Sequence, residues 1–492
     1  MKTCIIIGGG IGGLVTGALL AKEGFQVTVL EKNAIIGGGL QTFKRHGVGF
    51  PTGMHIFGGF REDGNLRKIF GYLGIMDEIS LHPTDENASD VVTMMDTGET
   101  YCLPRGKEYF IAYLAEKFPA EKEHIKDYIN RLFKLSEEED LFYLREASAD
   151  HISHSDDFLG SVNQLRDRYI TNPKLKSLLA YLNPLFGGDP QTTPAYIHAL
   201  LSTLHINGTF QFVGESQQMA DALVKVIENA GGQVLANEEV VKIEVENRQV
   251  TSVFTSKGHR YQAENYISDV HPDMLLRIID PQAFSTAFKS RIQSVPETSS
   301  SFKVYIKFKD KAFPYQNHAH FCLSDTCDWP QSVMFVTPPV PQQGEFAETM
   351  VIISPMDFGK VKQWENTRLG HRGEEYELWK QEMTNEMLAF MARLYPDFRN
   401  YIEFAFAASP LTIRDYYGNK EGSNYGFQKD SNHLMLSQMS VSTKVKNLFL
   451  TGQNVNIHGL CGVSLTAIET AEALVGRNMI VNKINNCCEN HL

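Results

Sequence analysis

Residues 3–32, TCIIIGGGIGGLVTGALLAKEGFQVTVLEK, contain a cluster of glycines between two apolar runs. The first run is short and β-branched, which is typical of a strand buried on both faces. Gly8, Gly10 and Gly13 follow it in the pattern G-x-G-x-x-G, and a helical apolar face then precedes a second strand-like run at 25–30. A strand, a glycine turn, a helix and a second strand in this order predict a dinucleotide-binding unit.

The glycine turn is suited to a pyrophosphate. Its first glycine allows a tight turn, its second lets the backbone approach the phosphates, and its third lets the helix pack closely on the strand. The helix N-terminus stabilises negative charge, and Gly12 belongs to the same predicted site. Glu31 ends the second strand, where a carboxylate accepts a hydrogen bond from a ribose 2′-hydroxyl and repels a 2′-phosphate. FAD or NAD is therefore favoured over NADP at this site, which includes the neighbouring Lys32.

The composition excludes several classes of protein. With 492 residues the chain is long enough for more than one hydrophobic core, and its net charge of −12 predicts no nucleic-acid partner. Seven scattered cysteines favour a reducing cytosol, and no apolar run reaches the ~20 residues of a membrane-spanning helix. We therefore expect a cytoplasmic protein. We predict no metal site, because none of the following pairs is completed by further ligands: Cys322/Cys327, His151/His154 and His318/His320.

A second group of glycines follows Glu31 at short range. The segments are KNAIIGGGLQTF at 32–43 and GVGFPTGMHIFGG at 47–59, where a NAD-binding unit would continue with another helix and strand. Both segments resemble the FAD-dependent amine oxidase and phytoene desaturase superfamily. More narrowly, they are similar to its retinol saturase and carotenoid isomerase branch, in which "GG..HTF" leads to "FDTGIHYIG". The resemblance implies that the cofactor is FAD.

The resemblance also implies where FAD is contacted. Gly39 stands where many relatives carry a basic residue near the phosphates, Gln41 replaces a His and Pro51 replaces an Asp. Backbone amides would therefore supply more of the phosphate binding here. The implied contacts in the first part of the chain are Gly37, Gly38, Gly39, Thr42, Gly53, Met54 and His55, and further along Val240, whose backbone would contact the adenine.

The segment NLFLTGQNVNIHGLCGVSL, at 447–465, is similar to the closing motif of these flavoproteins. A strand, a glycine-rich loop running to Gly462 and a helix beginning at Val463 are expected, with the amides at the helix start directed at the flavin N1/O2 edge. Cys461 is interpreted as a small packing residue, with a redox role as the alternative, and His458 is an acid/base candidate. No catalytic residue is assigned. The implied FAD contacts in this motif are Gly452, Gln453, Asn454, Gly462 and Val463.

The middle of the chain predicts a different architecture. Periodicity predicts helices over 119–147 and 173–184, the second being either a core helix or a surface that contacts a membrane or gates the substrate. Tyr417 and Tyr425 either line the flavin or are structural. Repeated strands around one long helix, at 373–394, predict a mainly antiparallel sheet that walls an apolar cavity. These strands are expected at 302–309, 332–338, 350–355 and 401–408.

Together these features predict an α/β protein with a Rossmann-like FAD-binding domain and an inserted α+β substrate domain with a helical lid. The FAD domain is expected over 1–80, 208–290 and 430–492, and the substrate domain over 81–207 and 291–429. The resemblance implies saturation, desaturation or cis–trans isomerisation of a carbon–carbon double bond in an apolar polyene or isoprenoid. A flavin amine oxidase and a non-catalytic, flavin-bearing lipid-binding protein are the alternatives. Because no second strand–GxGxxG–helix unit is found, we expect an external electron donor or acceptor, and peripheral contact with a membrane is left open.

Overall fold

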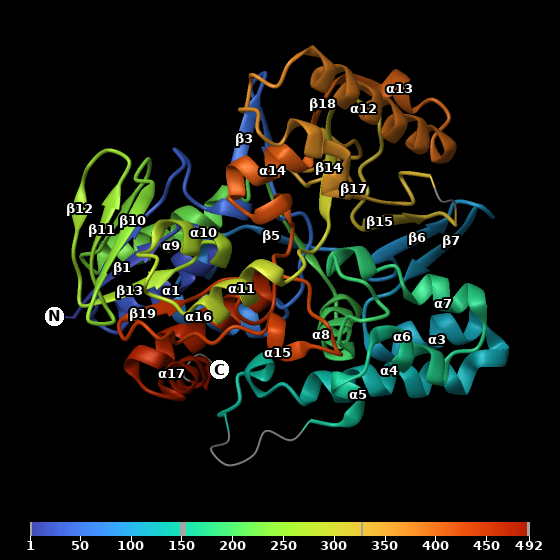
Figure 1. Ribbon diagram of the computed structural model, residues 1–492. Helices are drawn as coiled ribbons and strands as arrows, with labels where there is room; N and C mark the ends of the chain where they lie inside the picture. Colours follow the sequence, from blue (N-terminus) through green and yellow to red (C-terminus); the bar gives the residue numbers. More distant parts are fainter. Residues whose placement is uncertain (1, 148–153, 326–327, 490–492) are drawn as a thin grey trace.

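The computed structural model describes residues 2–147, 154–325 and 328–489. A five-stranded sheet joins the start, middle and end of the chain, and every pairing of neighbouring strands in it is parallel (Figure 1). Residues 4–7 in its central strand are buried, as the apolar run predicts. In order across the sheet the strands are β19 (Leu448–Leu450), β13 (Asn265–Ser268), β1 (Thr3–Ile7), β2 (Gln26–Leu30) and β9 (Gln233–Leu235).

Helices from distant parts of the sequence pack on this parallel sheet. Helix α1 (Ile11–Lys22) contacts both α9 (Gln217–Asn229) and α16 (Gly459–Val475), and it is almost entirely buried as a result. Helix α17 (Met479–Glu489) packs on α2 (Asn65–Leu73). The glycine turn that opens the chain is thus enclosed by elements from its middle and its end.

A seven-stranded sheet forms the second part of the molecule (Figure 1). All its pairings are antiparallel except that between β15 and β6. The mainly antiparallel sheet is confirmed, whereas three of its strands, β6, β7 and β15, were not expected. In order the strands are β18 (Ile402–Ala408), β14 (Ser300–Phe308), β17 (Thr349–Met356), β16 (Ser332–Val336), β15 (Ala319–Leu323), β6 (Asp90–Met94) and β7 (Glu99–Leu103).

Smaller elements connect and cover the two sheets. Helices α12 (Glu374–Leu394) and α13 (Phe398–Tyr401) share a hydrophobic core with the seven-stranded sheet. The remaining strands form a three-stranded antiparallel sheet and two antiparallel pairs, of which only the first joins strands adjacent in the chain. These strands are β10 (Val240–Glu246), β11 (Gln249–Thr255) and β12 (Arg260–Tyr261); β3 (Thr42–Arg45) with β4 (Val48–Pro51); and β5 (Leu81–Pro83) with β8 (Phe210–Phe212).

A helical layer follows β7 in the chain. The helix expected over 119–147 is shorter than predicted: it ends at Glu137, and the chain then turns through Leu144, whose φ is 52°. The helix expected over 173–184 ends at Leu179, and its leucines are buried, which favours the core-helix interpretation. The helices of this layer are α3 (Lys107–Lys117), α4 (Lys122–Glu137), α5 (Asp156–Leu159), α6 (Val162–Tyr169), α7 (Pro173–Leu179) and α8 (Ala195–Ile206).

Four further helices lie between the strands: α10 (Pro272–Ile278), α11 (Thr286–Ser294), α14 (Pro410–Tyr417) and α15 (Leu434–Ser437). Within the described residues, no single helix has the length and apolar character of a membrane span. Helices α16 and α17 meet that criterion only as a pair bent by 118°.

Candidate functional site

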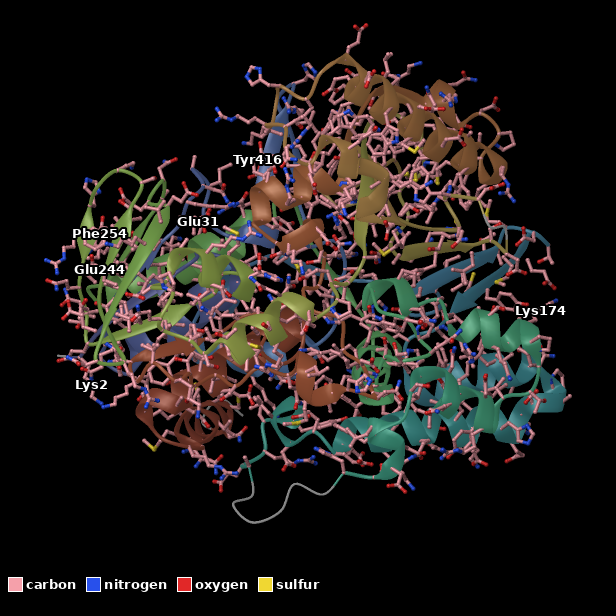
Figure 2. The ribbon with its side chains drawn as sticks, viewed as in Figure 1. Lys2, Glu31, Lys174, Glu244, Phe254 and Tyr416 are labelled. Carbon is pink, nitrogen blue, oxygen red and sulfur yellow. The ribbon has the colours of Figure 1, made fainter. Side chains whose placement is uncertain are left out.

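A cavity lies where the strands of the parallel sheet end, and it collects most of the predicted FAD contacts. Its walls come from the start, middle and end of the chain; Figure 2 labels two of its lining residues, Glu31 after β2 and Tyr416 in α14. We call it the dinucleotide cavity. The predicted residues that line it are Gly8, Gly10, Gly12, Glu31, Lys32, Gly38, Gly39, Gly53, Met54, Val240, Gly452, Gln453, Asn454 and Val463.

The backbone of the glycine turn borders this cavity directly, because its glycines leave no room for side chains at these positions. Gly8 has a φ of 108°, which favours glycine. A Cβ on Gly12 would lie 2.2 Å from Oδ1 of Asp269 and 3.0 Å from Cα of Gly452, and one on Gly13 would lie 2.0 Å from the carbonyl oxygen of Gly8. A turn of bare backbone at the start of α1 fits a pyrophosphate, which approaches amide groups closely.

Glu31 is held in place by backbone amides. Its Oε2 accepts a hydrogen bond from the Gly9 amide and its Oε1 accepts one from the Asn33 amide, both at 2.8 Å. The side chain is buried at the cavity wall. This fixed carboxylate fits the predicted ribose contact.

Asp269, directly after β13, is a cavity residue that the sequence analysis missed. Its Oδ2 accepts a hydrogen bond from the Gly13 amide at 2.9 Å, at the N-terminus of α1. Burial, with a smaller contribution from the charge of Glu31, raises the pKa of this carboxyl group to about 7. An acid immediately after a strand-like run was the available signal, since the ends of parallel strands meet at one edge of a sheet.

The closing motif differs from the prediction in one respect. Helix α16 begins at Gly459, not at Val463, so Gly462 lies in the first helical turn and not in the loop. A Cβ on Gly462 would lie 2.6 Å from the backbone of Ile457, which explains the need for glycine where the preceding loop folds against the helix. Asn454 accepts a hydrogen bond from the Phe427 amide at 2.9 Å and thereby ties the motif to the segment before it.

Five predicted contacts do not line the dinucleotide cavity. Gly13 packs inside α1; Gly37 faces Ala220, which would lie 2.9 Å from an added Cβ. Thr42 lies 3.4 Å from the Ser216 hydroxyl. His55 and Gly462 border a neighbouring cavity instead. Packing between elements accounts for the first three positions.

The neighbouring cavity is largely apolar, and we call it the substrate cavity. It lies between the loop after β4, helix α8, the seven-stranded sheet and the start of α16, and no Asp or Glu is among its described lining residues. The apolar wall includes Phe57, Leu200, Leu201, Leu204, Phe321, Met334, Ile353 and Leu465. Six residues line both cavities, which therefore meet: Gly53, Met54, Tyr417, Asn424, Tyr425 and Gly459.

A few polar groups interrupt the apolar wall. Lys303 on β14 donates a hydrogen bond to the carbonyl of Thr52 at 2.7 Å, and burial lowers its pKa to about 8. Burial, and then the charge of Lys303, lowers the pKa of His55 well below its usual value. Neither ring nitrogen of His55 has a hydrogen-bond partner among the described residues. Burial also raises the pKa of Tyr425 to about 12.

The two residues singled out beside the closing motif occupy apolar surroundings. His458 occupies the position just before α16, and its Nε2 donates a hydrogen bond to the carbonyl of Leu185 at 3.1 Å and not to the helix. Burial lowers the pKa of its ring to about 4. Burial raises the pKa of Cys461 to about 12, and its sulfur accepts a hydrogen bond from Asn65 at 3.3 Å. A protonated, enclosed thiol fits the packing interpretation.

No group of three or more metal-ligating side chains occurs within 2–147, 154–325 and 328–489. His151 and Cys327, each part of a pair considered from the sequence, lie outside the described residues.

Comparisons with known proteins agree with this geometry. A family model described as flavin containing amine oxidoreductase matches residues 11–475. All-trans-retinol 13,14-reductase of Rattus norvegicus is 26% identical, over 96% of this chain and 86% of its own. Prolycopene isomerase 1 of an Oncidium hybrid cultivar is 24% identical, over 92% of this chain and 79% of its own.

Among solved structures, putrescine oxidase bound to putrescine superposes with a TM-score of 0.68 at 16% identity, covering 97% of this chain and 99% of its own. That likeness concerns the fold. The chain therefore belongs to the flavin-containing amine oxidoreductase family, as an FAD-dependent oxidoreductase with an α/β fold.

Proposed function

We propose that this protein acts on a carbon–carbon double bond of an apolar polyene or isoprenoid, such as a retinoid or carotenoid, by saturation, desaturation or cis–trans isomerisation. One observation carries the proposal: an apolar cavity meets the dinucleotide cavity at Tyr417, Tyr425 and four further shared residues. FAD supplies the hydride or electron transfer for such chemistry when bound. The names of the retinol reductase and prolycopene isomerase relatives support the same class of substrate.

The residues that line the dinucleotide cavity are proposed to hold FAD. The backbone at Gly10 and Gly12 would face the pyrophosphate, Glu31 would accept from the ribose, and Val240 would lie at the adenine. We further propose that the chain divides into an FAD domain and a substrate domain with the boundaries predicted from the sequence. The seven-stranded sheet and α8 would then enclose the substrate.

Charge favours a neutral substrate over an amine. A protonated amine in an apolar cavity needs an anion beside it. The described wall of the substrate cavity carries no carboxylate, and Lys303 contributes a basic group. An external electron donor or acceptor completes the proposal, since the sequence shows no second GxGxxG unit.

Anaerobic mixing of the FAD-loaded protein with three candidates tests the proposal: all-trans-retinol, a carotenoid and putrescine. Flavin absorbance and product mass are followed with oxidised and with chemically reduced flavin. We expect a product from a polyene that differs by two hydrogens, or by double-bond geometry alone. Flavin bleaching by putrescine would instead identify an amine oxidase, and an inert flavin in every mixture would support a non-catalytic role.

A further inference from the structure

A buried polar cluster borders the substrate cavity away from its junction with the dinucleotide cavity. Nδ1 of His205, near the end of α8, lies 2.8 Å from Oδ2 of Asp90, the first residue of β6. The hydroxyl of Tyr181 donates to the same oxygen at 3.0 Å. The side chains of Asp90 and His205 are each 3% exposed. His205 lines the substrate cavity and is absent from the wall of the dinucleotide cavity.

An apolar side chain, Phe321, packs against this cluster, and the charge of Asp90 also acts on the nearby His318. The ring of Phe321 lies 5.0 Å from that of Tyr181 and 6.5 Å from that of His205. Burial of polar and ionisable groups is costly, and apolar side chains of similar size often replace a buried pair without loss of stability. The position of the pair at the cavity wall therefore points to recognition of a ligand.

Two side-chain atoms of the cluster have no hydrogen-bond partner in the described ranges: the enclosed Oδ1 of Asp90, and Nε2 of His205, the cluster residue that lines the cavity. Nδ1 of His205 is taken by Asp90, whereas Nε2 makes no hydrogen bond to any residue in the described ranges. Because Nδ1 is already paired with Asp90, Nε2 is the ring nitrogen that remains to bind a group in the cavity that His205 lines. The adjoining cavity wall is formed by Leu201, Leu204 and Phe321, which suit a hydrocarbon chain.

The chemistry of Nε2 selects the end group of the ligand. This nitrogen is a donor or an acceptor, depending on the tautomer and charge of the ring. A hydroxyl group both donates and accepts, so it matches Nε2 in either state. A carboxylate would be repelled by Asp90, and a methyl group would leave a buried polar atom unpaired.

We propose that His205, oriented by Asp90 and Tyr181, binds the terminal hydroxyl group of an elongated apolar alcohol. This inference rests on the proposed function and narrows its substrate class to alcohol-ended polyenes or isoprenoids. His205 would contact the substrate, and Asp90 would be a positioning residue.

The test measures binding of three matched ligands to the FAD-loaded protein through the change in flavin absorbance. The probes are all-trans-retinol, the hydrocarbon in which a methyl group replaces its hydroxymethyl group, and retinoic acid. We expect the alcohol to bind about tenfold or more tightly than either analogue, because they leave Nε2 unpaired or place a charge beside Asp90. The variant His205→Phe should lose this preference while binding the hydrocarbon as before.

Two further variants separate recognition from folding. His205→Gln keeps a polar group and should retain part of the preference, and Asp90→Asn should raise the KM for the alcohol more than for the hydrocarbon. His198→Phe is the matched control: His198 is a buried histidine of the same helix, 3.2 Å from the Tyr128 hydroxyl, and it does not line the cavity. This variant should keep the full preference.

Equal binding of all three ligands, or of none, overturns the inference, as does an unchanged preference in the folded His205 variants. If the preference is present but no ligand is converted, the proposed reaction fails and the hydroxyl site stands.

Discussion

Oδ2 of Asp269 lies 2.9 Å from the backbone nitrogen of Gly13 and accepts its hydrogen bond. An acidic side chain from the middle of the chain thus faces the first turn of α1, where the amides suited to a pyrophosphate are located. Glu31 faces the same region, and Lys32, Glu239 and His271 line the cavity around it.

Binding of FAD is expected to weaken as the pH rises through about 7, the pKa of Asp269. A neutral carboxyl group tolerates a nearby diphosphate, whereas an ionised one repels it, so bound FAD favours the protonated form. Affinity should be constant below this pH and fall by up to about tenfold per pH unit above it. Fluorescence titration of apoprotein with FAD from pH 5.5 to 8.5 gives the profile. Asp269→Asn should flatten it, and an equally steep profile in that variant would contradict the explanation.

Gly12→Ala should yield protein with little or no bound FAD. The added Cβ would lie 2.2 Å from Oδ1 of Asp269 and 3.0 Å from Cα of Gly452, and it would fill the space beside the turn. The FAD-to-protein ratio after purification measures the effect. Gly71→Ala in α2 is the control, since its Cβ meets nothing within 4 Å, and it should keep FAD while stabilising the helix by about 1 kcal/mol. A normal FAD content in Gly12→Ala would show that this close approach is not required.

Lys303→Met should change how stability depends on alkaline pH. Burial lowers the pKa of Lys303 from 10.5 to about 8, so the folded state holds this proton less well than the unfolded state. The wild-type free energy of unfolding should therefore lose a contribution of the order of 3 kcal/mol as the pH falls from 10.5 to 8. The variant lacks this titrating group, so its free energy of unfolding should fall less between pH 10.5 and pH 8. Urea denaturation of both proteins at several pH values in this range provides the comparison. Parallel plots of unfolding free energy against pH would refute the prediction.

Cys461 should resist alkylation in the native protein. Burial raises the pKa of its thiol to about 12, which leaves almost no reactive thiolate near neutral pH. Cys102 is exposed and serves as the internal control. Peptide mass spectrometry after brief treatment with iodoacetamide should find Cys102 modified and Cys461 intact. Cys461→Ala should keep most of the activity; fast labelling of Cys461 together with loss of activity would restore the redox interpretation.

Local sequence determined the dinucleotide-binding unit. The β-branched run that forms β1 and the glycine at φ 108° that follows it depend on steric preferences of adjacent residues. The strands β14, β16, β17 and β18 were likewise visible as apolar runs. The same reasoning placed the start of α16 at Val463 instead of Gly459, because the glycine-rich stretch before it gives no clear local signal for the first helical turn.

Tertiary structure alone decided which distant residues meet. Asp269 reaches Gly13 because β13 lies beside β1 in the parallel sheet, and Asp90 reaches His205 because β6 packs near the end of α8. Strands β6, β7 and β15 were missed for the same reason, since their pairing joins segments far apart in the chain. Such contacts depend on how sheets and helices pack around a shared core, a property that no spacing within one segment encodes.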